Sequence, residues 1–293
     1  MRKAERLTYL FVIPAVVVFA LLTVYPLIYA IVTGFYKIDF IKAKTMFYGF
    51  QNYAEILTDD TFWVAVKNTL LFVVLAVVFE TLLGTVFALF FNSGFRFMKL
   101  YRTIVLMPML LPPITVALTW KMMYDYNFGI FNFLLKTIGL SPVEWLSSTD
   151  WALLSVVLTD IWQWTPFVFL VILASLQSIP LEIYESAQVE GASYVQSLRY
   201  ITLPLLRPAL ALVLLLRTID TFRVFDKMYV LTGGGPGNAT ETITYYIYRY
   251  GFRYFQTGYA AAASIVMVIM VLVFSIPYIK QVIGTADFQR NAN

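Results

Sequence analysis

The sequence has 293 residues, of which 60% are hydrophobic and only 13% charged, and its mean hydropathy is +0.75. A water-soluble domain is closer to half apolar and a quarter charged, so much of this chain is expected to lie in lipid. It holds no cysteine and no histidine, and its net charge of +4 is small. These features exclude disulfides and thiolate metal sites, disfavour histidine-based catalysis, and argue against a nucleic-acid partner.

The first apolar segment follows the basic residues Arg2, Lys3 and Arg6 and runs from Leu10 to about Thr33. A secretory signal has a shorter apolar run that ends in a small-residue cleavage site. We therefore expect a retained membrane span.

A helix needs about 20 apolar residues to cross the hydrocarbon, because every backbone amide must be bonded internally there. Six segments qualify, namely Tyr9–Thr33, Asn68–Phe91, Thr103–Met123, Trp151–Leu176, Pro208–Val230 and Tyr259–Tyr278. The third contains Pro108, Pro112 and Pro113, which predict a kinked or broken helix whose freed carbonyls must be bonded by protein or water. The expected fold is all-α, with residues 1–293 forming one polytopic membrane domain of six transmembrane helices.

Basic residues are unevenly distributed among the connections. The connection 92–102 carries Arg96, Lys99 and Arg102 and no acid, whereas 37–65 sets three lysines against four acids and 124–150 holds one cation, Lys136. Because cytoplasmic loops carry an excess of Lys and Arg, both termini and the connection 177–207 are expected in the cytoplasm. The predicted location is the cytoplasmic (inner) membrane of a bacterium or archaeon.

The connection 177–207 is long and reads as an amphipathic segment. Gly191 lies near its middle, where a bend costs little. Pro204 and Pro208 are expected to end the segment and start the fifth span. The residues that share one face are Ile183, Ala187, Gly191 and Tyr194.

Part of this connection closely resembles the EAA loop of permease subunits from binding-protein-dependent ABC importers, in which E-A-A precedes a Gly and then I-x-L-P. The matching residues are Glu185, Ala187, Gly191, Ala192, Ile201, Leu203, Pro204 and Pro208. The departures are Ser186 for Ala, Glu190 for the usual Asp, and Leu198 where Phe is common. Each departure keeps the size or charge class.

The resemblance implies that residues 182–204 form a coupling element, in which two short helices meet at Gly191 and dock into a cleft of a cytoplasmic ATPase. The acidic residue of the motif would make a polar contact there. The alternative is an amphipathic helix on the membrane surface. The three glutamates of residues 182–204 argue against that alternative, because an anionic leaflet would repel them.

Other segments resemble the carbohydrate branch of the family, which includes maltose and glycerol-phosphate permeases. They include Gly49-Phe50-Gln51-Asn52-Tyr53 before the second span and the loop Gly233-Gly234-Gly235-Pro236 after the fifth. The resemblance covers nearly the whole chain from about residue 9, in the short six-span form. It implies a second permease subunit, two ATPase subunits and an extracytoplasmic binding protein as partners.

No G-x-x-x-x-G-K-[ST] motif occurs, so ATP and Mg²⁺ are expected on the partner ATPase subunits, and no cofactor or catalytic residue is assigned to this chain. The loop Gly233–Pro236 has two interpretations. It is either a flexible turn or a loop at the mouth of the solute path, facing the binding protein.

Polar side chains within the spans are costly and seldom face lipid. In the fourth span they form a polar and aromatic stripe of Asp160, Gln163, Trp164 and Phe167. In the fifth they form a cluster of Arg217, Asp220, Thr221, Arg223 and Val224. The resemblance implies that both sets line the solute path. Alternatively, Arg217 pairs internally with Asp220, and Asp160 and Glu80 pair with an arginine across the bundle.

The sequence thus predicts a permease subunit that imports a sugar or sugar-like solute by alternating access. The alternatives are a secondary transporter or channel driven by an ion gradient, for which the internal repeat is lacking, and a carboxylate-based membrane enzyme, for which an acid pair is lacking. Monosaccharides, oligosaccharides and polyol phosphates all remain open. Arg217 and Arg223 favour an anionic solute, whereas Asp220 and Asp226 weaken that preference.

Overall fold

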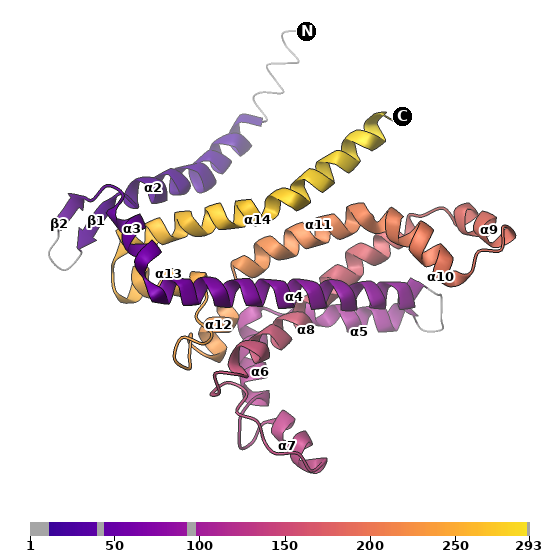
Figure 1. Ribbon diagram of the computed structural model, residues 1–293, viewed down its shortest axis with the longest axis horizontal. Coiled ribbons are helices and arrows are strands. Elements are labelled where there is room, and N and C mark those ends of the chain that lie inside the picture. Colours follow the sequence, from indigo (N-terminus) through magenta and orange to yellow (C-terminus); the bar gives the residue numbers. More distant parts are fainter. Residues whose placement is uncertain (1–11, 40–43, 93–97, 292–293) are drawn as a thin grey trace, which may run out of the picture. The chain divides into compact units, whose positions relative to one another are not determined.

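The computed structural model describes residues 12–39, 44–92 and 98–291, and the regular secondary structure of these residues is helical apart from one short hairpin (Figure 1). Helical turns of the π type are labelled η. The elements are η1 (Ala20–Val24), α2 (Tyr25–Thr33), β1 (Tyr36–Asp39), β2 (Lys44–Phe47), α3 (Gln51–Thr58), α4 (Asp60–Asn92), α5 (Met98–Leu110), α6 (Pro113–Met123), α7 (Ile130–Thr137), α8 (Ala152–Gln177), α9 (Leu181–Val189), α10 (Tyr194–Ser197), η2 (Leu198–Thr202), α11 (Leu203–Phe222), α12 (Asp226–Leu231), α13 (Ile243–Tyr248), η3 (Arg249–Arg253) and α14 (Thr257–Asn291).

Five helices of the described chain are long and apolar enough to cross a membrane, and a sixth crossing results if α5 and α6 form one span. They are Val12–Thr33, Asp60–Asn92, Ala152–Gln177, Tyr194–Phe222 and Thr257–Gln281. The predicted all-α, polytopic fold class is therefore confirmed. Residues 9–11 of the first predicted span lie outside the described residues.

The predicted start and end of the fifth span were wrong. The helix runs without interruption from Tyr194 through Pro204 and Pro208, and it ends at Phe222 instead of Val230. Pro204 follows the π turn η2 directly, so its missing N–H leaves one carbonyl of that turn without an intrahelical bond, and the helix continues nonetheless. Hydropathy registers the apolar run but not the break at residues 223–225, after which the chain forms the separate helix α12.

The predicted break of the third span is confirmed. Helices α5 and α6 meet at an angle of 96° around Leu111 and Pro112. The side-chain amide of Gln163 on α8 donates a hydrogen bond to the Leu111 carbonyl at 3.0 Å. A neighbouring helix therefore bonds a carbonyl at the break, as the membrane interior requires.

Two further bounds differ from the prediction, and one element was not predicted. Helix α4 begins at Asp60, eight residues before the expected Asn68, and α14 extends beyond Tyr278. The strands β1 and β2 pair antiparallel, with Tyr36 opposite Phe47. The start of α4, the end of α14 and the two strands lie at or beyond the ends of the apolar runs, where hydropathy carries little information about secondary structure.

The chain divides into two compact units, Met1–Trp63 with Tyr246–Met270 and Val64–Tyr245 with Val271–Asn293. In the second unit, α4, α8 and α11 share a core. Gly84 allows close approach of α4 to α8, because a Cβ atom there would lie 2.6 Å from the Val168 side chain. The buried residues of this core are Ala88, Phe91, Val168, Phe169, Ile172, Leu173, Leu176, Leu206 and Val213.

Candidate functional site

A cavity of about 300 Å³ lies beside the C-terminal end of α11 in the second unit. Its lining comes from α6, α8, α11, α12 and the residues that join α11 to α12. The lining residues are Pro113, Asp160, Trp164, Arg217, Asp220, Thr221, Arg223, Val224, Phe225, Asp226 and Lys227.

The structure brings together seven of the nine residues predicted to line the solute path: Asp160, Trp164, Arg217, Asp220, Thr221, Arg223 and Val224. Gln163 and Phe167 do not line this cavity. Gln163 bonds the carbonyl at the break between α5 and α6, and Phe167 packs on the core of α4, α8 and α11. The helical period predicted that Gln163 and Phe167 lie near the face of α8 that carries Asp160 and Trp164. What the two side chains contact depends on the position of α5 and α6.

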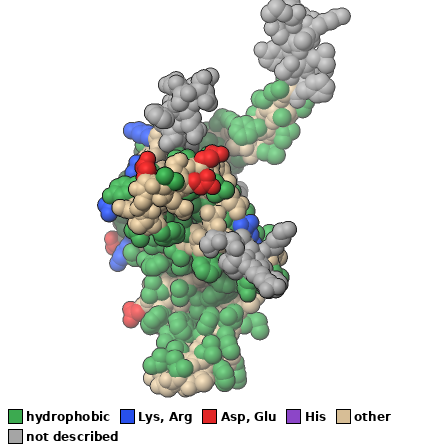
Figure 2. Space-filling model, turned by 90° about the vertical axis from the view of Figure 1, so that its right-hand side faces the viewer, with side chains coloured by type: hydrophobic (Ala, Val, Ile, Leu, Met, Phe, Trp, Pro, Cys, Tyr) green, Lys and Arg blue, Asp and Glu red, His purple; other side chains and the backbone are tan. Residues whose placement is uncertain are grey.

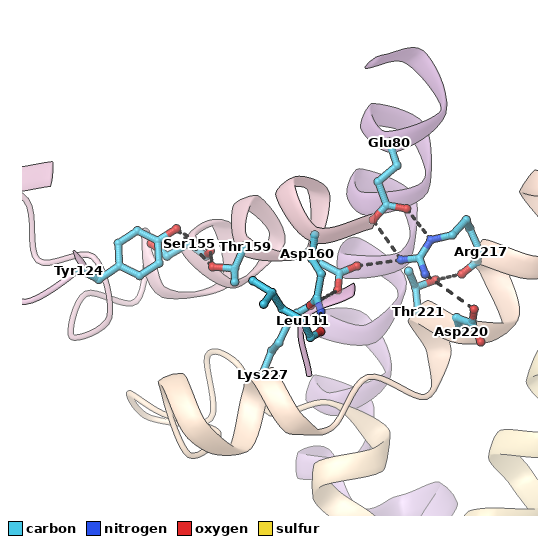
Figure 3. A network of polar contacts seen from close by, with 11 residues as sticks. Glu80, Leu111, Tyr124, Ser155, Thr159, Asp160, Arg217, Asp220, Thr221 and Lys227 are labelled. Carbon is cyan, nitrogen blue, oxygen red and sulfur yellow. Dashed lines mark hydrogen bonds and ion pairs between the residues drawn. The ribbon is translucent and has the colours of Figure 1, made fainter. Parts of the chain in front are cut away.

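Arg217 is the centre of a buried polar network and is 1% exposed (Figure 3). Its Nε donates to Glu80 Oε2 at 2.6 Å, and its Nη2 donates to Glu80 Oε1 at 3.1 Å and to Asp160 Oδ2 at 3.0 Å. Its Nη1 lies 3.7 Å from Asp220 Oδ2. Lys227 Nζ donates to the other Asp160 oxygen.

The network joins four helices, because Glu80 lies on α4, Asp160 on α8, Arg217 on α11 and Lys227 on α12. Its two buried carboxylates balance its two buried cations. Pairing of opposite charges offsets much of the cost of placing them in a membrane interior. The alternative that Asp160 and Glu80 pair with an arginine across the bundle is therefore confirmed, and that arginine is Arg217.

Sequence reasoning missed Lys227. It lies within the predicted fifth span, and an ionisable residue in such a span indicates a buried partner. That signal was available in the sequence, although Asp160, its partner, is 67 residues away.

The open side of the cavity combines an aromatic ring with exposed charges. Trp164 is half-buried, and its ring centroid lies 4.8 Å from the Arg217 guanidinium carbon, within range of a cation–π contact. Asp220 and Arg223 are exposed and lie 3.7 Å apart. This face offers a flat apolar surface next to hydrogen-bond donors and acceptors.

The predicted bend in the connection after α8 is present at Gly191. Helix α9 ends there in a Schellman motif, in which Ala192 N–H donates to the Ala187 carbonyl and Gly191 N–H to that of Gln188. Gly191 has φ +80°, a left-handed conformation that favours glycine. Glycine therefore fits this position because the backbone turns there.

The second arm of this element starts with a capping box. Ser193 Oγ accepts from Gln196 N–H, and the Gln196 side chain accepts from Ser193 N–H. The two arms enclose a hollow of about 330 Å³. Of the predicted coupling residues, Ala187, Glu190, Gly191, Ala192 and Ile201 line this hollow.

The remaining predicted coupling residues lie outside the hollow. Glu185 is exposed on α9, and Leu203 and Pro204 form the first turn of α11. Figure 2 looks onto the end of the molecule that carries α9 and α10, where acidic side chains are exposed. The surface also exposes Val189, Tyr194, Val195 and Tyr200.

The glycine-rich loop after α12 is internally bonded. Gly235 N–H donates to the Thr232 carbonyl, and the Thr240 hydroxyl bonds both the Gly235 carbonyl and the Thr232 hydroxyl. Asn68 on α4 donates to the carbonyls of Asn238 and Glu241. These bonds argue against the flexible-turn interpretation of the Gly233–Pro236 loop.

Comparison with known proteins gives consistent matches. Residues 80–279 match the family described as "Binding-protein-dependent transport system inner membrane component". The chain is 40% identical over 279 residues to a trehalose/maltose transport system permease protein of Thermococcus litoralis, covering 95% of this chain and 94% of that protein. It is 33% identical over 282 residues to a sulfoquinovosyl glycerol transport system permease protein of Agrobacterium fabrum, covering 96% and 91%.

A solved structure matches over a similar length. It is a chain of a bacterial alginate ABC transporter in complex with an alginate pentasaccharide-bound periplasmic protein. The TM-score is 0.83 at 28% identity, covering 94% of this chain and 93% of that chain.

Proposed function

This chain belongs to the binding-protein-dependent transport system inner membrane components, the permease subunits of ABC importers, and we propose that its solute is a sugar or sugar-like molecule. The observation that carries the proposal is the cavity at the end of α11, where Trp164 lies beside Asp220 and Arg223. Sugars have C–H faces that pack on aromatic rings and hydroxyls that bond to carboxylates and guanidinium groups. The names of the two relatives and the solved transporter, which refer to trehalose or maltose, sulfoquinovosyl glycerol and alginate, support the same solute class.

In this proposal the chain pairs with a second permease subunit, two ATPase subunits and an extracytoplasmic binding protein. The complex of the alginate transporter with a sugar-bound periplasmic protein supports the last of these partners. ATP and Mg²⁺ would bind to the ATPase subunits, so this chain contributes the path and the coupling but no chemical step.

Residues 182–204 would dock into the ATPase from the cytoplasmic side. The continuity of the helix supports this role, because α10, η2 and α11 form one helix from Tyr194, just after the bend at Gly191, to Phe222 beside the cavity (Figure 1). A rise of about 1.5 Å per residue lets such a helix transmit a displacement over tens of ångströms. Movement of the bend at Gly191 would therefore be transmitted along this helix to the cavity wall.

Transport would proceed by alternating access. The loaded binding protein docks on the outer side, near the Gly233–Pro236 loop. ATP-driven closure of the ATPase then moves the bend at Gly191 and opens the cavity to the outer side. After hydrolysis the cavity opens to the cytoplasm and releases the solute.

The proposal is tested with the complete importer reconstituted in vesicles. Trp164→Ala and Asp220→Ala are expected to abolish sugar uptake while the complex still assembles and hydrolyses ATP. Trp162→Ala is a matched control, because Trp162 lies on the same helix but does not line the cavity. Normal uptake by both cavity variants would contradict the assignment.

A second measurement separates the proposal from the ion-gradient alternative. The purified chain without its partners is expected to move no sugar, and uptake by the importer is expected to require ATP. Uptake by the isolated chain in response to a proton or sodium gradient would favour the secondary transporter.

A further inference from the structure

The charged side chains around the cavity fall into two sets that differ in exposure. Asp160, Arg217 and Lys227 have side chains that are 4%, 2% and 3% exposed. Asp220 and Arg223 have side chains that are 48% and 66% exposed, and Asp226 is half-buried. Only the second set is readily accessible to a solute.

The buried cations are already bonded to carboxylates of the protein. Two nitrogens of Arg217 bond Glu80 and Asp160, and the third faces Asp220. If Arg217 turned toward a solute, the buried Glu80 would lose its bonded partner, which is strongly unfavourable. Lys227 is held in the same way by Asp160.

The accessible set contains two carboxylates, on Asp220 and Asp226, and one guanidinium, on Arg223. Arg223 lies 3.7 Å from Asp220, so part of its attraction for an anion is cancelled. The charge of Asp220 is in turn compensated by Arg217 and Arg223, whereas Asp226 forms no such pair among the described residues. Charges in a partly buried cavity are screened less than in water, so Asp226 would repel a phosphate or carboxylate on the solute. An uncharged sugar meets no such repulsion.

The same groups suit hydroxyls. The carboxylates of Asp220 and Asp226 accept hydrogen bonds from hydroxyls, and Arg223 donates to them. Trp164 offers an aromatic surface to the C–H face of a sugar ring, and its contact with Arg217 helps to hold the ring in place.

We therefore infer, on the basis of the proposed function, that this permease takes an uncharged saccharide and discriminates against sugar phosphates and uronates. Arg217 and Lys227 serve the internal network and are not anion ligands. The discrimination resides mainly in the accessible carboxylate of Asp226.

The test compares uptake by the complete importer of maltose and trehalose, each beside its phosphate monoester. A methyl ether at the same hydroxyl controls for size. The uncharged sugar and the ether are expected to enter at least about tenfold faster than the monoester, as one uncompensated charge repulsion implies.

The variant Asp226→Asn distinguishes the selectivity of the cavity from that of the binding protein, because the unmodified and the variant importer are assayed with the same binding protein. Removing one accessible carboxylate is expected to raise the ratio of monoester to disaccharide uptake several-fold. The control is Asn127→Asp, which changes the charge at an exposed residue outside the cavity; Asn132→Asp is unsuitable because Asn132 is buried. Asn127→Asp is expected to leave the ratio of monoester to disaccharide uptake unchanged.

Equal or faster uptake of the monoester by the unmodified importer would overturn the inference, as would an unchanged ratio in Asp226→Asn. An importer that moves only anionic sugars would also overturn it while leaving the proposed function intact. An importer that moves no sugar of either kind would instead contradict the proposed function.

Discussion

Single residues decide whether charges can be placed inside this membrane protein. Arg217 bonds Glu80 and Asp160 from two other helices, and Lys227 bonds Asp160 from a third. Removing one member of a buried, balanced set leaves an uncompensated charge, whereas removing a matched pair does not. The network should therefore respond differently to single and paired substitutions.

The variant Arg217→Ala is expected to lower stability by about 3–5 kcal/mol, because Glu80 and Asp160 would then share only Lys227. The measurement is the thermal unfolding of the purified protein in detergent. The double variant Arg217→Met with Glu80→Gln is expected to recover much of the loss. Arg223→Ala, at an exposed weak pair, should change stability by less than about 1 kcal/mol.

A second polar cluster lies in the first unit, outside the membrane-spanning segments. Asp59 Oδ2 accepts hydrogen bonds from the hydroxyls of Tyr246 at 2.6 Å and Tyr250 at 3.2 Å, and Asp59 Oδ1 accepts from Thr61 N–H at 2.8 Å. Partial burial acts to raise the pKa of Asp59, but these hydrogen bonds outweigh it and lower the pKa below its ordinary value. Burial and the bond to Asp59 raise the pKa of Tyr246.

Because the folded pKa of Asp59 is lowered, its stabilising contribution is fully present above the unfolded value of about 4 and is lost as the pH falls through the folded pKa. Asp59→Asn is therefore expected to be less stable than the unmodified chain at neutral pH, with the difference shrinking in acid. Thermal unfolding across the acid range measures this. Tyr246→Phe should move the loss to higher pH; an identical acid profile would contradict the role of that hydrogen bond.

At the scale of elements, the bend at Gly191 combines a Schellman motif with the capping box of the next helix. Both motifs use only local backbone and side-chain bonds, so the bend was predictable from sequence. The proposed coupling role depends on the stiffness of this bend.

Gly191→Pro is expected to uncouple uptake from ATP hydrolysis without removing the protein from the membrane, because proline cannot adopt φ +80°. The measurement is the ratio of sugar taken up to ATP hydrolysed in vesicles. Gly139→Pro is a matched control, since Gly139 has φ +79° and, like Gly191, has open space where a side chain would be. Equal ratios in the two variants would count against the coupling role.

The broken third span shows what sequence can and cannot tell about an element. Pro108, Pro112 and Pro113 predicted a break because proline lacks the N–H of a helix. That Gln163 bonds the carbonyl of Leu111 depends on how α8 packs, and the sequence gives no signal for it. Because of the same packing, Gln163 does not line the cavity, although its position in the helical period had predicted that it would.

For the whole molecule, the orientation in the membrane stays a prediction from the distribution of Lys and Arg. Because the chain contains no cysteine, single cysteines can be introduced without background. In intact cells, Lys136→Cys is expected to react with a membrane-impermeant maleimide and Glu190→Cys is not. After lysis both should react. Labelling of Glu190→Cys from outside would reverse the topology and contradict the proposed docking to a cytoplasmic ATPase.

The sequence by itself determined the number and approximate position of the spans, the break at the prolines and the turn at Gly191, because apolar length, a missing N–H and a left-handed φ are local properties. Only the tertiary structure decided that Glu80 bonds Arg217, 137 residues away, that Lys227 joins Asp160, and that α11 ends at Phe222. Each of these depends on contacts between distant segments. Hydropathy and period describe each segment separately, whereas the partner of a buried charge is fixed by how the helices pack.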